Sequence, residues 1–526
     1  MPQYADRAGF LRSSMLACTL ALLAMLSGCT LPALDGRTLS SAVSPEETRG
    51  TALGQAAARL VPARSSHSGI HPLADARHAF AARVLLTRNA ERTLDVQYYI
   101  WRKDITGVLL LHEMQKAAYR GVRVRLLLDD HGTAAADAEL AALNAHPQVE
   151  VRLFNPFSVR RPKYIGFLTD FSRLNRRMHN KSFTADNQFT IVGGRNIGDE
   201  YFGATDGLIF ADLDVLAIGP VVDETSRDFD RYWASASAYP AELILPDPVP
   251  DALDQLQAAG AVAASADAAT EYLLAVRRSG FMRALSSGEL PFEAAFTRMV
   301  SDDPAKALAK ADRRGHLMPQ LMAILGQPRR SVDLVSPYFV PTTAGVEAFA
   351  ALVREGIRVR VLTNSLQATD VAVVHAGYAK RRKALLQAGV SLFELRELSQ
   401  EAGHDERHRV VGPFGSSGSS LHAKTFAIDG ERVFVGSFNF DPRSINLNTE
   451  LGFVIESRML AREVATAFET SIPAYAYEVR LSDNGSLYWL ERTPEGVLRH
   501  DFEPGTDPLQ RFGIRLLSIL PIEWLL

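Results

Sequence analysis

Two short stretches decide the fold: residues 179–186 read HNKSFTAD, and residues 422–429 read HAKTFAID. Each has a His, a Lys two positions later and an Asp five positions after the Lys. One match to so short a pattern is weak. Two matches at corresponding places are strong, because chance would have to act twice in register. The chain is therefore predicted to contain one structural unit written twice.

The repeat extends upstream of both motifs. Residues 94–100 (LDVQYYI) are echoed by 332–340 (VDLVSPYFV), and residues 120–128 (RGVRVRLLL) by 355–363 (EGIRVRVLT). In each half the order is strand, helix, Gly, strand, which indicates βαβ units. The predicted fold is α/β: two βαβ halves packed as an intrachain pseudo-dimer, with mixed, largely parallel sheets covered by helices.

Composition divides the chain into six segments. We expect a lipoprotein signal peptide at 1–29, a tether rich in Ser, Ala, Gly and Pro at 30–72, a first α/β domain at 73–245, a helical insert at 246–326, a second α/β domain at 327–475 and a C-terminal extension at 476–526. Residues 509–526 mix apolar side chains with Arg511, Arg515 and Trp524. They either lie in a membrane interface or pack against the body of the protein.

The N-terminus predicts export and lipid attachment. Arg7 and Arg12 precede an apolar run, 15–26, which is shorter than the roughly 20 residues of a spanning helix and is typical of a secretory signal. The run ends in Leu-Ser-Gly-Cys at 26–29, which resembles a bacterial lipobox; the alternative is a plain signal peptide with an incidental Cys29. We expect a protein lipid-anchored at Cys29 on a bacterial membrane, facing the periplasm, with the choice of inner or outer membrane left open.

Charge and cysteine content exclude some classes of protein. The formal net charge is -3, from 57 basic and 60 acidic residues, so the chain lacks the cationic excess of a general nucleic-acid binder. Both cysteines, Cys18 and Cys29, lie in the N-terminal segment. The mature fold therefore holds no disulfide and no thiolate metal site.

The motif residues suit phosphodiester chemistry. Side chains two apart on a strand point the same way, so each His and Lys share a face. One imidazole can attack phosphorus while the other protonates the leaving oxygen, and an ammonium group neutralises the phosphate oxygens. We expect neither metal nor cofactor. The candidate catalytic residues are the motif residues His179, Lys181, Asp186, His422, Lys424 and Asp429, although the two Asp residues also suit a turn-capping role.

Each motif is followed by a turn signal, Asp186-Asn187 or Asp429-Gly430. Two-residue hairpin turns at these places predict the partners of the motif residues across each hairpin. On that register Ser437 lies opposite His422, Val435 opposite Lys424, and Gly194 opposite His179. Asn196 and Asn439 then lie one step beyond, on the same face as their His.

The paired motifs, followed by Gly-Gly-Arg-Asn at 193–196 and Gly-Ser-Phe-Asn at 436–439, resemble the signature of the phospholipase D superfamily. Residues 171–178, 441–444 and 519–526 are similar to its cardiolipin synthase C-type branch. The resemblance implies that Glu450 orients a catalytic imidazole and that Asp212 is its first-half counterpart, with Asp214 as a competitor. It also implies His179 as nucleophile and His422 as general acid. The supporting residues are Asn196, Asp212, Ser437, Asn439 and Glu450.

The same resemblance implies a phosphatidyltransferase that makes cardiolipin through a phosphatidyl-histidine intermediate. Its expected partners are the membrane and its phospholipid substrates, phosphatidylglycerol with phosphatidylethanolamine or a second phosphatidylglycerol as donor, and not nucleic acid. The first alternative is a hydrolytic phospholipase D that releases phosphatidic acid. Less favoured are a nuclease and a lipid-binding protein without catalytic activity.

Overall fold

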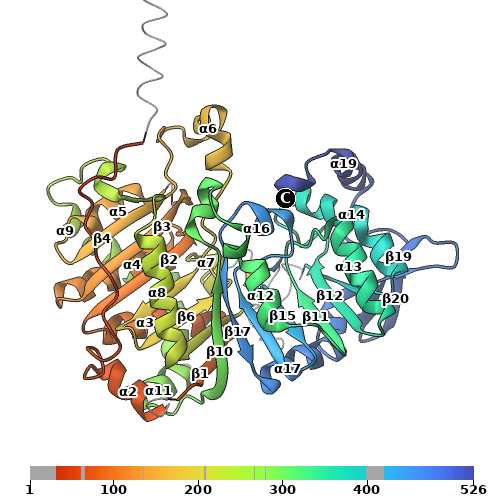
Figure 1. Ribbon diagram of the computed structural model, residues 1–526, viewed down its shortest axis with the longest axis horizontal. Helices are drawn as coiled ribbons and strands as arrows, with labels where there is room; N and C mark the ends of the chain where they lie inside the picture. Colours follow the sequence, from red (N-terminus) through yellow and green to blue (C-terminus); the bar gives the residue numbers. More distant parts are fainter. Residues whose placement is uncertain are drawn as a thin grey trace, which may run out of the picture.

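The computed structural model describes residues 31–60, 65–133, 135–205, 209–265, 267–278, 280–397 and 420–526. The expected signal peptide, with Cys29, lies outside these residues. Figure 1 shows two α/β halves side by side, the first coloured red to yellow-green and the second green to blue. The α/β class and the doubled architecture are confirmed.

The strands of the first half form a mixed sheet. In spatial order they are β9 (Ala238–Pro240), β4 (Val149–Phe154), β3 (Arg123–Gly132), β2 (Thr93–Ile100), β5 (Ser182–Ala185), β6 (Phe189–Gly193), β8 (Asp214–Ile218) and β1 (Ser68–Leu73). The β2–β3 and β3–β4 pairs are parallel, and the other pairs are antiparallel. β2 and β3 are buried along most of their length because helices cover both faces.

The second half repeats this order and adds two strands, β19 and β20. In the opposite direction, starting with the counterpart of β1, its strands are β10 (Glu293–Ser301), β17 (Leu451–Glu456), β16 (Arg432–Gly436), β15 (Thr425–Ile428), β11 (Ser331–Val335), β12 (Arg358–Asn364), β13 (Ser391–Leu395), β18 (Ala476–Leu481), β19 (Leu487–Thr493) and β20 (Gly496–His500). Here the parallel pairs are β11–β12 and β12–β13. The sheets are mixed as expected, but their parallel part is limited to three neighbouring strands in each half.

The repeat is also visible in single side chains. Arg125 of β3 forms a buried ion pair with Asp95 of β2 at 2.7 Å, and Arg360 of β12 pairs with Asp333 of β11 at 2.6 Å. The halves join where β1 pairs antiparallel with β10. One sheet therefore runs without interruption through both halves.

Helices cover the sheets (Figure 1). Those of the first half are α2 (Ala52–Leu60), α3 (Ala76–Asn89), α4 (Ile105–Tyr119), α5 (Asp137–Asn144), the 3₁₀ turn η1 (Lys163–Ile165), α6 (Gly166–Leu174), α7 (Asp199–Phe202), α8 (Pro220–Trp233) and η2 (Ala241–Leu243). In the sequence, the segment between the two halves contains α9 (Ala252–Ser265), α10 (Asp267–Arg278), α11 (Gly280–Ser287), η3 (Pro304–Leu308), η4 (Arg313–Gly315) and α12 (Leu317–Leu325). The second half has α13 (Thr342–Arg354), α14 (Ala372–Gln387), α16 (Pro442–Asn446), α17 (Arg458–Glu469), α18 (Ile472–Tyr475), α19 (Pro508–Ile519) and η6 (Glu523–Leu525). Among the described residues no helix has both the length and the apolar character needed to cross a bilayer.

Three segments outside the two expected domains contribute strands to the sheet. The expected tether, 30–72, contains α2 and most of β1, the strand that links the halves. The expected helical insert, 246–326, also supplies β10, and the expected extension, 476–526, begins with β18 in the second sheet. In the expected tether, a stretch rich in small residues therefore contains most of a strand of the sheet. Burial of Ile70 and Leu73 is what makes β1 an interior strand.

Candidate active site

Each motif lies at the start of a hairpin whose register differs by one residue from the prediction. Ala185 pairs with Phe189 and Ile428 with Arg432, so each turn has three residues instead of two. The dipeptides do adopt left-handed backbone, with φ of 51° at Asp186 and 58° at Asp429. A third turn residue moves every opposed pair by one position. The predicted partners of the motif His and Lys residues are therefore wrong.

The two motif aspartates do not line the reaction cavity. The Asp186 carboxylate accepts the backbone N–H groups of residues 91–93, at the start of β2, at 2.8 to 3.3 Å. The Asp429 carboxylate does the same for residues 329–331 at the start of β11, at 2.6 to 3.0 Å. Each ties its hairpin turn to the neighbouring strand. These contacts match the turn-capping role expected for both residues, and neither carboxylate is among the residues that line the cavity.

The halves exchange backbone hydrogen bonds beside the catalytic His residues. β7 (Phe210–Ala211) of the first half pairs with β14 (Ser420–Leu421) of the second, and the His422 N–H donates to the Ala211 carbonyl at 2.7 Å. At the equivalent place the His179 N–H donates to the carbonyl of Thr449 at 2.9 Å. The residue before each acid is thus bonded to the His of the other half.

This exchange crosses the imidazole–carboxylate pairs. His179 Nδ1 lies 2.8 Å from Glu450 Oε2, and His422 Nδ1 lies 2.6 Å from Asp212 Oδ2. Asp214, the competing candidate, is instead paired with the buried Arg83 at 2.8 Å. The structure therefore places Asp212 and Glu450 at the imidazoles, each in the half opposite to its His. With Nδ1 engaged, Nε2 of each ring is left for a substrate.

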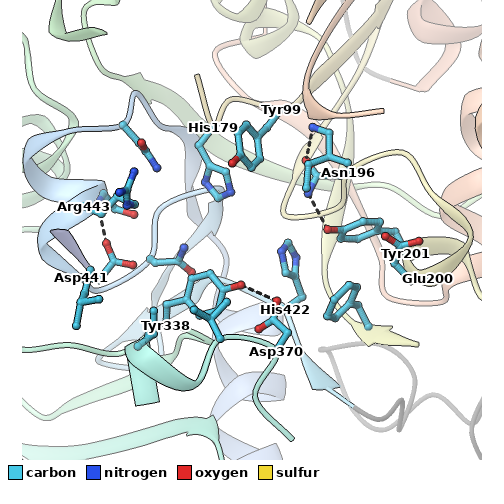
Figure 2. Close-up of a pocket in the computed structure, with 18 of the residues that line it drawn as sticks. Tyr99, His179, Asn196, Glu200, Tyr201, Tyr338, Asp370, His422, Asp441 and Arg443 are labelled. Atoms are coloured by element: carbon cyan, nitrogen blue, oxygen red, sulfur yellow. Dashed lines mark hydrogen bonds between the residues drawn. The ribbon is translucent and has the colours of Figure 1, made fainter. Parts of the chain in front are cut away.

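Both imidazoles enter one cavity of about 840 Å³ between the halves (Figure 2). Tyr99 packs edge-on against His179 with ring centroids 5.0 Å apart, and Tyr201 against His422 at 5.2 Å. Asn196 also lines it: its amide donates to the Tyr201 hydroxyl at 3.0 Å. Asn439, from the second half, lines the cavity too. The two predicted Asn residues are thus at the site.

Lys181 and Lys424 are buried beneath the imidazoles. Each ammonium donates to the backbone carbonyl of its own motif His at 2.5 Å. Burial lowers the pKa of both lysines, that of Lys181 well below its ordinary value. An anionic phosphate beside them favours their charged forms, so substrate binding reverses part of this shift.

The two carboxylates carry different charge. Burial raises the pKa of Glu450 to about 7, against the opposing effects of Lys181 and the Ser437 hydroxyl. Burial also acts on Asp212, but His422 and Lys424 outweigh it and hold its pKa at about 2. Near neutrality Asp212 is therefore an anion, while Glu450 is partly protonated.

The surroundings of both imidazoles favour their uncharged forms. Burial, reinforced by Lys424, lowers the pKa of His422 to about 4. Burial with Lys181 and Lys424 lowers the pKa of His179 well below its ordinary value. A neutral imidazole has a free lone pair on Nε2, so neither ring needs to lose a proton before it attacks phosphorus.

Gly194 and Ser437, which follow the two hairpins, contact the carboxylates of Asp212 and Glu450 in different ways. A Cβ on Gly194 would lie 2.2 Å from Asp212 Oδ1, so only glycine lets the backbone pass. Ser437, after the second hairpin, donates its hydroxyl to Glu450 Oε2 at 2.5 Å. Ser437 therefore acts on the carboxylate and not on the cavity.

Several residues of the cavity wall were not found from the sequence. Tyr338 donates its hydroxyl to Asp370 at 2.7 Å, and Arg443 donates to the carbonyl of Leu525 at 2.9 Å. Tyr99, Tyr338 and Arg443 lie in stretches already noted as repeated or family-like, and this was the available signal. Asp370 and Tyr201 come from segments without such a pattern.

Known proteins match this chain over most of its length. A family model described as "Cardiolipin synthase, PLD-like domain" matches residues 86–233 and 321–472. Cardiolipin synthase C of Escherichia coli (strain K12) is 50% identical over 476 residues, which covers 89% of this chain and 99% of that protein. Cardiolipin synthase A of Pseudomonas entomophila (strain L48) is 27% identical over 430 residues, covering 81% of this chain and 73% of its own.

A solved structure shares the fold. The crystal structure of phosphatidylserine synthase from Haemophilus influenzae Rd KW20 matches with a TM-score of 0.55 at 14% identity. The match covers 90% of this chain and 100% of that one. Both halves are therefore part of the shared architecture.

Proposed function

This chain belongs to the cardiolipin synthase family with PLD-like domains, and from that premise we propose that it is a phosphatidyltransferase that makes cardiolipin. The single observation that carries the mechanism is the crossed pairing, with both imidazoles in one cavity at 2.8 and 2.6 Å from their carboxylates. Two oriented imidazoles provide a nucleophile and a proton donor on one phosphate without further groups.

The first step forms a covalent adduct. The anionic phosphate of the bound donor, together with Asp212, favours protonation of His422. His179 Nε2 then attacks phosphorus of the donor phospholipid, the bond from phosphorus to the headgroup oxygen breaks, and the protonated His422 gives that oxygen its proton. In the second step a hydroxyl of phosphatidylglycerol attacks phosphorus, its proton passes to His422, and the phosphorus–nitrogen bond breaks. The donor is phosphatidylethanolamine or a second phosphatidylglycerol.

The charges of the carboxylates support these roles. The anionic Asp212 stabilises a positive charge on His422, as a general acid requires. Glu450, with a pKa of about 7, stabilises charge on His179 less strongly and leaves it neutral, as a nucleophile requires.

Lipid analysis tests the proposal. The purified protein is incubated with labelled phosphatidylglycerol, with and without phosphatidylethanolamine. Cardiolipin is the expected product, and a yield that rises with phosphatidylethanolamine identifies that lipid as donor. Phosphatidic acid as the sole product would replace transfer by hydrolysis, and unchanged lipid would remove the proposal.

We also propose that the mature protein is lipid-anchored at Cys29 on the periplasmic side of a bacterial membrane. Support comes from Leu-Ser-Gly-Cys at 26–29 after a short apolar run. Metabolic labelling with a fatty acid should mark the wild type and not Cys29→Ser. A Cys29→Ser protein that is still labelled by the fatty acid, or whose signal peptide is processed normally, would contradict the anchor.

A further inference from the structure

Two apolar surfaces project from the same edge of the molecule. Figure 1 shows α6 on the first half and α19 on the second, both at the upper edge, with the C-terminal end of the chain between them. On α6 the exposed large side chains include Leu168, which is 85% exposed, and Phe171. Burying a contiguous apolar surface of this kind against another surface is favourable, because it removes apolar area from water.

The exposed face of α19 is continuous. Leu509, Phe512, Leu516 and Ile519 are spaced three or four residues apart, so they share one side of the helix, and each is more than half exposed. Ile514, on the other side, is buried against the body of the protein. Of the two interpretations that the sequence left open for this segment, packing against the body is observed for the Ile514 side of the helix. The membrane interpretation stays a prediction for the exposed side.

Both surfaces are joined to the reaction cavity. Beyond α19 the chain turns inward, and Leu525 and Leu526 line the cavity wall. From α6 a series of ring contacts runs inward from Phe171 through Phe167 to His131, each with centroids 6.3 Å apart. It continues to Tyr99 at 6.3 Å and from there to His179 at 5.0 Å.

The path of the N-terminal segment leads to the same edge. Arg37 donates to the carbonyl of Ser235 at 2.6 Å, and the carbonyl of Ser237 accepts the N–H of Asn155. The Asn155 amide in turn donates to the carbonyl of Arg173 on α6. Cys29 is eight residues before Arg37, and eight extended residues reach at most about 28 Å. An anchor on Cys29 would hold this edge near the bilayer.

The charges beside α6 suit an anionic surface. Residues 160–176 contain five basic side chains and one acidic side chain. Arg160 and Lys163 are paired with Asp130 and Arg173 with Asp170, whereas Arg161 is exposed to solvent. On α19, Arg511 and Arg515 flank the apolar face. Basic groups around an apolar face are typical of helices that lie in the interface of anionic membranes.

We propose that α6 and α19 form a membrane-docking face that seats the mouth of the cavity on an anionic bilayer. This rests on the proposed function, because a phospholipid substrate must enter from a bilayer. The exposed apolar side chains of this face insert among the lipids, and the basic side chains beside them contact headgroups. The apolar side chains are Leu168, Phe171, Leu509, Phe512, Leu516, Ile519 and Trp524.

Tryptophan fluorescence tests the docking directly. Of the four tryptophans, Trp101, Trp233 and Trp489 are buried, whereas Trp524 is 58% exposed. The full lipidated chain is reconstituted with vesicles of phosphatidylglycerol brominated in the acyl chains. We expect quenching of the tryptophan emission, and Trp524→Phe should remove most of it. Absence of quenching in a protein that makes cardiolipin from the same vesicles would overturn the proposal.

A variant with three acidic substitutions tests the face as a whole. Leu168→Glu, Phe512→Glu and Ile519→Glu together should reduce both the quenching and turnover on vesicles at least about tenfold, because three apolar groups lose their lipid contacts. Turnover of short-chain phosphatidylglycerol in monomeric solution should not change, which shows that the fold is intact. The matched control is Val497→Glu with Leu498→Glu, exposed residues of β20, and it should behave as wild type.

The outcomes separate this proposal from the proposed function. Quenching of Trp524 without any lipid product would remove the proposed function and leave the docking face. Chemical cross-linking of the wild type and the triple variant is measured in parallel. If the triple variant keeps its quenching but loses cross-links between two chains, the face binds a second copy and docking on a bilayer is overturned. Equal loss of turnover on vesicles and on monomeric lipid would also overturn it.

Discussion

The two imidazole–carboxylate pairs have the same topology and different charge. In both, the His of one half meets the acid of the other, at 2.6 Å for His422 with Asp212 and 2.8 Å for His179 with Glu450. Yet the pKa of Asp212 is lowered to about 2 and that of Glu450 is raised to about 7. A duplicated fold can thus place equivalent groups and still give them different chemistry through the residues packed around them.

The surroundings of the two acids explain the difference. The Asp212 carboxylate accepts the Leu213 N–H at 2.8 Å. The buried Arg195 donates to the backbone carbonyl of Asp212, which places a positive charge near the carboxylate. The hydrogen bonds to Glu450 from His179 and Ser437 converge on one oxygen, Oε2. The buried Lys306 is engaged by Asp302 at 2.9 Å, which limits its effect on Glu450.

The largest expected effect comes from removing either imidazole. His179→Ala and His422→Ala should each reduce turnover by at least about 10³-fold, because every step uses both groups. After exposure to a donor with a good leaving group, His422→Ala should carry a phosphatidyl adduct on His179, and His179→Ala should carry none. Mass spectrometry locates the adduct. A label on His422 in the His179→Ala protein would exchange the two roles.

The amide substitutions test the charge difference itself. Asp212→Asn should reduce kcat by about 10³-fold, because it removes an anion that stabilises the charged imidazole. Glu450→Gln should reduce kcat only about tenfold at neutral pH, because it replaces a carboxyl that is already partly protonated. Steady-state kinetics between pH 6 and 8 compare them. Equal losses would mean that the two acids carry the same charge.

The same variants should change stability in opposite directions. Below about pH 4.5, the ordinary pKa of a Glu, Glu450 is protonated in the folded and unfolded states alike. From there to about pH 7 only the folded state keeps the proton, so wild-type stability falls as pH rises. Glu450→Gln should therefore gain in relative stability from pH 5 to 8, by up to roughly 3 kcal/mol.

For Asp212 the sign is reversed, because its folded-state pKa of about 2 is below the ordinary 3.8. Its stabilising effect is present above pH 3.8 and lost towards pH 2, so Asp212→Asn should lose roughly 2 kcal/mol at neutral pH. Urea unfolding across this pH range measures both variants. A parallel pH dependence in the two proteins would contradict the assigned charges.

The smallest expected effects on turnover come from the motif aspartates. Asp186 is fully buried and accepts three backbone N–H groups, so Asp186→Ala should lower the free energy of unfolding by about 3 kcal/mol. Asp429 is 8% exposed, and Asp429→Ala should lower it by about 2 kcal/mol. The kcat per folded molecule should be retained in both. A selective loss of kcat with normal stability would return these residues to the catalytic set.

Much of the fold and of the site could be predicted from the sequence. The duplicated motifs and the echoed strands were enough for the two α/β halves, since strand and helix patterns depend on local alternation. Asp212 and Glu450 came from family position and not from spacing. Which acid serves which His could not be read, because the pairing depends on the contacts of Ala211 and Thr449 across the two halves.

Other features were beyond the sequence for definite reasons. The third residue in each turn is Gln188 or Glu431. Neither residue type is typical of a particular turn, so the sequence does not indicate a three-residue loop. Tyr99 and Tyr338 reach the cavity because their strands end there, and strand ends are the least certain part of a predicted element. The role of β1 depends on its neighbours β8 and β10, which are far away in the sequence.

The crossed backbone bonds at His179 and His422 also affect how the chain matures. A chain whose first half has folded while the second is still unfolded has His179 without Glu450 and Asp212 without His422. Such an intermediate lacks both oriented imidazoles. The chemistry of the site therefore begins only after His422 and Glu450 of the second half have reached their partners in the first half.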